Sequence, residues 1–249
     1  MPLIVLFLFS QTELFAPDKI VRFADFLYEE KDYSAALNEY RRYLFLADSI
    51  PEITYERIID CLVQLKRYDE AVKESNSIKN TGRRNFIKGE IFFRAGIYDS
   101  SRYYLNLAGL PYKERAKELT GLTYANEFRF QEAGNYLKLP GNLPHYKKPI
   151  LGAIFSLLPG GGHFYCGRIG DGFFSLLIVG AATGLSYYYH SQKEELKFGV
   201  SLGTAVLFYM ANIYGGINAV RNYNYYQNEK YLWSIEALAK EKEESDKEK

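Results

Sequence analysis

The chain has 249 residues, enough for one large domain or two small ones. Its 31 Lys and Arg residues almost balance its 30 Asp and Glu residues, so the composition excludes the strong basic charge of a nucleic-acid-binding protein. With two cysteines and three histidines, the sequence contains neither a disulfide framework nor a metal-binding motif.

An apolar run, Leu3–Phe9, lies near the start of the chain. It fits the core of a signal peptide and is too short to cross a bilayer. No basic residue precedes it, and no clean cleavage site follows it. We expect residues 1–16 to be a signal peptide, and the alternative is a hydrophobic first turn that packs on the next helices.

An aromatic residue recurs about every 30–35 residues between two amphipathic patterns, which predicts stacked helix pairs. A small residue follows each aromatic three positions later, where it allows the partner helix to approach. The aromatic residues are Tyr33, Tyr68, Tyr98 and Phe130, and the small residues are Ala36, Ala71, Ser101 and Ala133.

This pattern resembles tetratricopeptide (TPR) repeats over about residues 18–139, with Ser101 as a departure from the usual alanine. The resemblance implies an all-α solenoid over residues 17–140 that binds a protein or peptide partner on its concave face. The alternative is that these helices pack only on each other or on the second half of the chain. Polar residues of the first helices, such as Asp25, Arg57, Arg94 and Asn126, are candidates for the binding face.

A glycine-rich segment, Pro159–Gly172, separates the charged first half of the chain from an apolar second half. Phe164 and Tyr165 lie among its glycines, whereas a solvated linker would be polar. The glycines and the proline predict irregular backbone here, in a re-entrant or interfacial segment. Such backbone is tolerated at membrane depth only where protein covers it, so we expect this segment to be covered. The glycine content predicts no helix around His163 and Cys166.

Two runs without charged residues follow, each near the length that crosses about 30 Å of hydrocarbon. We expect a hairpin of transmembrane helices at about 173–190 and 198–220, within a membrane module at 149–226. The alternative is two buried helices of a large soluble core. Residues 227–249 form a charged tail, either a solvated helix end or disordered.

Gly180-x-x-x-Gly184 and Gly199-x-x-x-Gly203 predict close packing of the two spans on each other, or a homo- or hetero-oligomer. The second span also carries Asn212, Tyr214, Asn218 and Asn222. Helical spacing places Asn212 and Asn222 on one face. Because amides are costly in lipid without partners, we expect this face to pack against the backbone of the glycine-rich segment.

The segment resembles an L-P-G-x-G-x-F-Y-x-G motif at the start of small two-helix membrane modules of bacteria, and also membrane-anchored TPR proteins of bacterial envelopes. The matching residues are Pro159, Gly160, Gly162, Phe164, Tyr165, Gly167 and Gly172. The resemblance implies a location in the bacterial inner membrane and says little about activity.

No residue set predicts catalysis. Gly160-Gly-Gly162 is not followed by the Gly-Lys-Ser/Thr of a phosphate-binding loop. We therefore expect no enzyme and no catalytic, cofactor-binding or metal-binding residues.

The sequence thus predicts a TPR-like adaptor that is anchored in the membrane and binds a protein partner. The alternative is an accessory subunit of membrane-protein insertion or envelope transport that acts through the two-helix module. The leader favours periplasmic repeats, which we expect, whereas the basic residues flanking the spans slightly favour cytoplasmic repeats.

Overall fold

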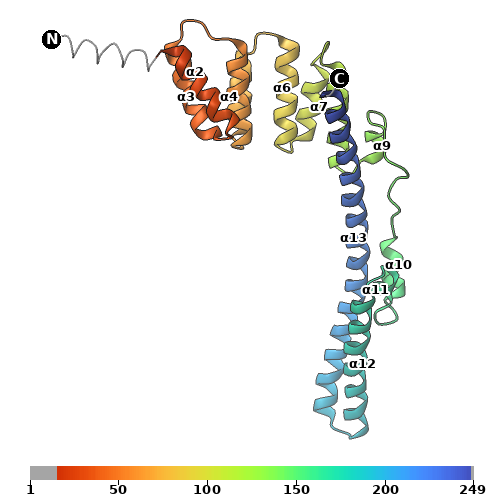
Figure 1. Cartoon of the computed structure of the whole chain (residues 1–249). Coiled ribbons are helices and arrows are strands. Elements are labelled where there is room, and N and C mark those ends of the chain that lie inside the picture. The colour runs from red at the N-terminus through yellow and green to blue at the C-terminus, as the bar shows by residue number, and fades with distance from the viewer. Residues whose placement is uncertain (1–15, 248–249) are drawn as a thin grey trace, which may run out of the picture. The chain divides into compact units, whose positions relative to one another are not determined.

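The computed structural model describes residues 16–247, so the expected signal peptide falls almost entirely outside the described residues. The chain divides into two compact units, Met1–Leu139 and Pro140–Lys249, called unit 1 and unit 2 below. Over residues 16–247 both contain helices and no strand (Figure 1), which confirms the expected all-α class.

The described part of unit 1 is a series of helix pairs. The first helices of the pairs are α2 (Pro17–Glu29), α4 (Glu52–Gln64), α6 (Thr81–Arg94) and α8 (Lys113–Asn126). The second helices are α3 (Tyr33–Leu46), α5 (Tyr68–Glu74) with the 3-10 helix η1 (Ser75–Ser77), α7 (Tyr98–Asn106) and α9 (Phe130–Ala133).

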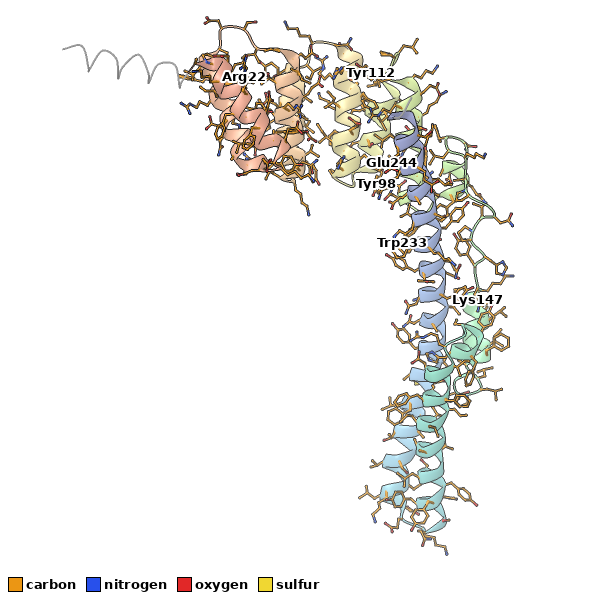
Figure 2. The ribbon with its side chains drawn as sticks, viewed as in Figure 1. Arg22, Tyr98, Tyr112, Lys147, Trp233 and Glu244 are labelled. Carbon is orange, nitrogen blue, oxygen red and sulfur yellow. The ribbon has the colours of Figure 1, made fainter. Side chains whose placement is uncertain are left out.

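Each recurring aromatic residue is the first residue of a second helix, as Tyr98 is in α7 (Figure 2). The small residue three positions later is completely buried in all four pairs. In the third pair this residue is Ser101, whose hydroxyl donates a hydrogen bond of 2.8 Å to the carbonyl oxygen of Gly89. Serine therefore replaces alanine there without leaving an unpaired polar group.

Each turn inside a pair contains one residue with positive φ, two positions before the aromatic residue. These residues are Lys31 (63°), Lys66 (58°), Gly96 (74°) and Phe128 (60°). The next N–H group then donates back to the first helix, as from Arg67 to the Leu62 oxygen at 2.8 Å. This arrangement closes the helix as a Schellman motif does.

Unit 2 consists of two short helices and two long ones. They are α10 (Pro149–Phe155), α11 (Gly161–Tyr165), α12 (Ile169–Ser191) and α13 (Glu195–Lys247). The antiparallel α12 and α13 form a hairpin joined by residues 192–194 (Figure 1). Gly167 and Lys193 have φ values of 76° and 58°, so the turns before α12 and α13 repeat the turn of unit 1.

One expectation for this half was wrong. The glycine-rich segment is not irregular throughout, because residues 161–165 form α11 and α12 already begins at Ile169. The expected span at about 198–220 lies inside α13, which continues to Lys247, so the charged tail is helical up to that residue, the first of its two alternatives. The C-terminal part of α13 is rich in Ala, Glu, Lys and Leu, which are strong helix formers.

The expected packing of the spans through their Gly-x-x-x-Gly motifs was also wrong. A Cβ added to Gly180, Gly184, Gly199 or Gly203 would meet no described atom within 4 Å outside the backbone of its own helix. The buried residues along this part of the hairpin instead include Val179, Ala182 and Ser186 of α12, and Ser201 and Ala205 of α13. The four glycines lie on other faces of their helices.

Candidate functional site

The first helices of unit 1 are linked by a row of ion pairs, which we call the first-helix face. In each pair an acid of one repeat meets an arginine of the next repeat. The pairs are Glu29–Arg57 (3.3 Å), Glu56–Arg83 and Glu90–Arg115 (3.9 Å). Exposed pairs of this kind add little stability. Their main effect is to neutralise charges along this face.

Two aspartates of the first helices accept hydrogen bonds from tyrosine hydroxyls. The Tyr40 hydroxyl donates to Asp25 at 2.6 Å, and the Tyr28 hydroxyl donates to Asp60 at 2.5 Å. Burial and the hydrogen bond to Asp60 raise the pKa of Tyr28 to about 12, and burial likewise raises the pKa of Tyr40. Both phenols therefore remain protonated donors at neutral pH.

Of the four polar candidates on this face, three have partners in their own chain. Asp25 accepts from Tyr40, Arg57 pairs with Glu29, and the Asn126 amide donates to the Leu122 oxygen at 2.9 Å. Arg94 is exposed at the end of α6, and the structure shows no side-chain partner for it among residues 16–247. Arg94 is thus the candidate best placed to meet a partner.

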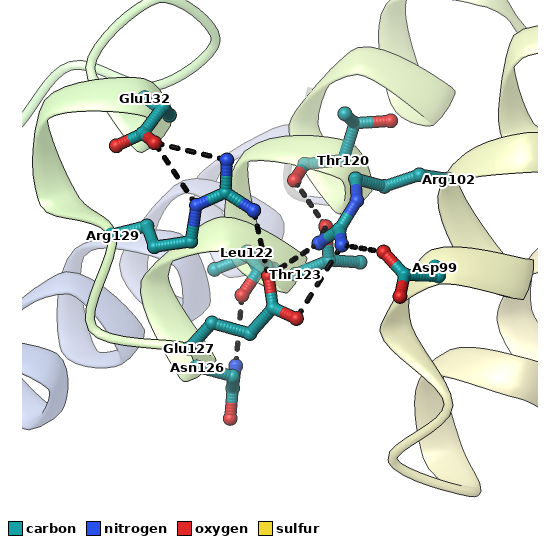
Figure 3. Close-up of polar contacts among 9 residues, drawn as sticks. All are labelled: Asp99, Arg102, Thr120, Leu122, Thr123, Asn126, Glu127, Arg129 and Glu132. Carbon is teal, nitrogen blue, oxygen red and sulfur yellow. Dashed lines mark hydrogen bonds and ion pairs between the residues drawn. The ribbon is translucent and has the colours of Figure 1, made fainter.

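The last two pairs of unit 1 are joined by a buried arginine, Arg102 of α7 (Figure 3). Its guanidinium donates to Glu127 at 2.7 Å and to the Thr123 hydroxyl at 3.2 Å, and it also pairs with Asp99. It lies 4.5 Å from the centroid of the Tyr124 ring. Because its donors are shared among these groups, Arg102 fixes α7 against α8 and is not free for a ligand.

Three glycines bring α10, α11 and α13 of unit 2 into backbone contact, and we call them with Ser156 the glycine junction. A Cβ on Gly162 of α11 would lie 2.1 Å from the Ser156 hydroxyl oxygen, and a Cβ on Gly216 of α13 would lie 1.8 Å from it. A Cβ on Gly152 of α10 would lie 2.8 Å from the Gly216 oxygen. Larger residues at these positions would separate the helices.

Asn212 of α13 holds the loop between α10 and α11. Its side-chain oxygen accepts from the Gly160 N–H group and from the Ser175 hydroxyl, both at 2.8 Å. Its amide donates to the Ser156 carbonyl at 2.7 Å. Asn212 is 4 % exposed, so this buried amide and two backbone groups of the loop satisfy one another.

A second asparagine clamp lies further along α13 and was missed in the sequence. Asn224 accepts from the Lys147 N–H group and donates to the Lys147 carbonyl, both at 2.8 Å. The Lys147 ammonium donates to the Tyr165 carbonyl and lies 4.2 Å from the Tyr223 ring centroid. Asn228 accepts from the Tyr146 hydroxyl at 2.6 Å. Residues 146–157 therefore run antiparallel along α13.

The remaining residues of the glycine-rich motif shape the turns around this loop. Gly160 has a φ of 83°, and a Cβ there would lie 2.1 Å from the Gly172 oxygen. The ring of Phe164 fills the space where a Gly172 side chain would lie, and Tyr165 packs against Phe155 at 5.1 Å between ring centroids. Pro159 precedes the left-handed Gly160.

Three residues predicted on the second span do not take part. Tyr214 is 65 % exposed and Asn222 is also exposed. Within residues 16–247 the structure shows no hydrogen bond from the side chains of Asn218 or Asn222. The expectation that Asn222 shares the packed face of Asn212 was therefore wrong, because the glycine junction and Asn224 define a face turned away from Asn222.

No protein-family model matches the chain, and no curated protein matches it. Among solved structures, the chain is similar to YrrB, described as a TPR protein with an unusual peptide-binding site. The alignment has 18 % identity and a TM-score of 0.37, and it covers 80 % of this chain and 89 % of that chain. A likeness at this level carries no argument about the fold or the function.

Two further features bear on chemistry. Over residues 16–247, no group of three or more His, Cys, Asp and Glu side chains is placed to hold a metal ion. A groove of about 570 Å³ lies between α12 and α13 near their connecting turn, and its walls include Ile178, Leu185, Leu196 and Phe208. These walls are mostly apolar, and their polar members are Tyr189, Lys197, Ser201 and Thr204.

Proposed function

We propose that the protein is a scaffold that unit 2 anchors in a lipid bilayer of the bacterial envelope and that binds a protein partner through unit 1. The observation that carries the anchoring is the apolar surface of the hairpin. Leu177 and Leu207 are each 68 % exposed and Met210 is 62 % exposed, on two helices long and apolar enough to cross a membrane. In water this surface would be unfavourable.

The internal pairing of polar groups supports the same proposal. A loop placed among lipid chains must satisfy its backbone groups within the protein. Asn212 does so for Gly160 and Ser156, and it lies beside the apolar residues of the hairpin.

Partner binding is proposed for the first-helix face of unit 1. Its ion pairs are already formed within the chain, so a partner meets a largely neutral surface. Exposed charged groups such as Arg94 then decide which partner binds to this face. An unpaired charge at the edge of an interface selects against partners of like charge.

Affinity capture from detergent-solubilised membranes tests this proposal with the full chain. We expect a specific protein to co-purify with the wild type and to be reduced about tenfold or more by Arg94→Glu, because a like-charge contact costs about 1.4 kcal/mol or more. The matched control is Lys73→Glu, an equivalent charge reversal at an exposed residue of α5. Equal capture by both variants would contradict binding at the first-helix face.

The alternative function, an accessory subunit of membrane-protein insertion or envelope transport, is favoured by the groove between α12 and α13. There Ala181 lies on one wall, where a larger side chain would reduce the volume. Capture that survives Arg94→Glu but is lost in Ala181→Phe would support this second function over the first.

A further inference from the structure

The outer face of α2 carries two exposed aromatic side chains. Phe23 is 52 % exposed and Phe26 is 57 % exposed. Their rings stack with 6.4 Å between centroids, so they form one continuous apolar patch. We call Phe23 and Phe26 the α2 patch. It lies on the first helix of the first described repeat.

The same positions are buried in later repeats, except that Lys88 of the third repeat is half-buried. Phe23 and Phe26 lie ten and seven residues before the turn aromatic Tyr33. In the second repeat these positions hold Ile58 and Cys61, both 0 % exposed. The seventh position holds Ile91 in the third repeat (2 % exposed) and Thr123 in the fourth (0 % exposed). The α2 patch is therefore a surface that the other repeats keep covered.

The second helix of the preceding repeat provides this cover. Ile58 and Cys61 share a core cluster with Leu37 and Tyr40 of α3. Thr123 accepts a hydrogen bond from Arg102 of α7. The described residues contain no helix in the equivalent place before α2, so the α2 patch lacks the partner that the repeat geometry provides elsewhere.

We propose that the apolar run Leu3–Phe9 of the same chain covers the α2 patch, in the place of a preceding second helix. The run contains only apolar residues and ends at Phe9, and residues 10–16 lead directly to Pro17 of α2. Between the later repeats, residues 47–51 and 107–112 make the equivalent connection. At about 3.3 Å per residue, residues 10–16 have enough length for it.

This assignment continues the stack of repeats and is independent of the proposed scaffold function. It gives Leu3–Phe9 a lasting role in the folded chain, in line with the second of the two interpretations that the sequence allows. A retained run also removes the argument from a cleaved leader for periplasmic repeats, and leaves the flanking basic residues, which favour the cytoplasmic side.

Site-specific photo-crosslinking in the full chain tests the proposal. Phe26 is replaced by the photoreactive p-benzoyl-phenylalanine, and the crosslinked peptides are identified by mass spectrometry after irradiation in cells. We expect an intrachain crosslink to a residue within 3–9. The matched control carries the same group at Phe45, which is 89 % exposed on α3, and should give no such crosslink.

The intact mass of the purified chain completes the test. A mature chain that begins near Pro17 would overturn the proposal, because the run would have been removed. A crosslink from position 26 only to a second copy or to another protein would overturn it as well, as would the absence of any crosslink to residues 3–9. Failure of partner capture, by contrast, would affect only the scaffold function.

Discussion

At the scale of single residues, buried polar side chains decide which backbone segments of unit 2 stay together. The side-chain oxygen of Asn212 accepts hydrogen bonds from the Gly160 N–H group and the Ser175 hydroxyl, and its NH₂ group donates to the Ser156 carbonyl. Desolvating an amide is favourable only when its donors and acceptors are paired. One residue therefore holds the α10–α11 loop against α13.

We expect Asn212→Leu to destabilise unit 2 by about 2–4 kcal/mol, because it leaves the Gly160 N–H group and the Ser156 carbonyl buried without partners. The measurement is the thermal unfolding midpoint in detergent. Asn222→Leu replaces an exposed amide of the same helix and should change stability by less than about 0.5 kcal/mol. Equal effects of the two variants would show that the hydrogen bonds of Asn212 do not hold the loop.

The chemistry of Asn212 could be predicted from the sequence, since an amide in an apolar helix needs a partner. The sequence could not predict that Asn224, and not Asn222, binds the segment that precedes α10. Asn224 is bonded only because Lys147, 77 residues earlier, lies beside it. Such a pairing depends on the register of the α10 segment along α13, which helical periodicity within α13 does not determine.

At the scale of elements, one turn is used throughout the chain. A residue with positive φ precedes α3, α5, α7, α9, α12 and α13. Gly occupies this position before only α7 and α12, so the sequence pattern did not identify it. The left-handed conformation is costly for residues with a Cβ, and a flanking hydrogen bond closes each turn.

We expect Lys66→Gly to stabilise unit 1 by about 1 kcal/mol, because glycine adopts the left-handed conformation without strain and the Lys66 side chain is exposed. Gly96→Ala is the reverse change at the equivalent position and should destabilise by a similar amount. Urea unfolding followed by circular dichroism checks both. Opposite signs are required, and a stabilising Gly96→Ala would refute the strain argument.

Glycines of unit 2 differ in role according to the element they face. The Gly-x-x-x-Gly pairs looked more important in the sequence, yet no described atom lies against their open sides. The glycine junction, in contrast, combines residues from α10, α11 and α13. Gly216 is far in the sequence from the other three members, so no local spacing predicts their contact.

Gly216→Ala should therefore destabilise unit 2 by about 1–3 kcal/mol, since the new methyl group would overlap the Ser156 hydroxyl oxygen. Gly180→Ala is the matched control, because its Cβ would meet open space, and it should leave the unfolding midpoint unchanged or higher. The thermal midpoint in detergent, followed by light scattering, distinguishes them. A loss of stability only in Gly180→Ala would contradict the observed packing.

At the scale of the whole molecule, a charged repeat unit and an apolar helical unit share one chain. The 23 residues of α12 span about 34 Å, close to the hydrocarbon thickness of a bilayer. The division into a charged repeat half and an apolar half was visible in the distribution of charges. The full length of α13 could not be predicted from the sequence, because alternating Glu and Lys residues are compatible with a helix and with a disordered tail.

The most direct test of the scaffold proposal is whether the hairpin crosses a membrane. The two native cysteines, Cys61 and Cys166, are buried, so a membrane-impermeant maleimide reports cysteines introduced at exposed positions. Lys79→Cys marks unit 1, and Gln192→Cys marks the turn between α12 and α13. In intact spheroplasts we predict labelling of only one of the two, with the other labelled only after lysis. Labelling of both in intact spheroplasts, or of both only after lysis, would contradict a spanning hairpin.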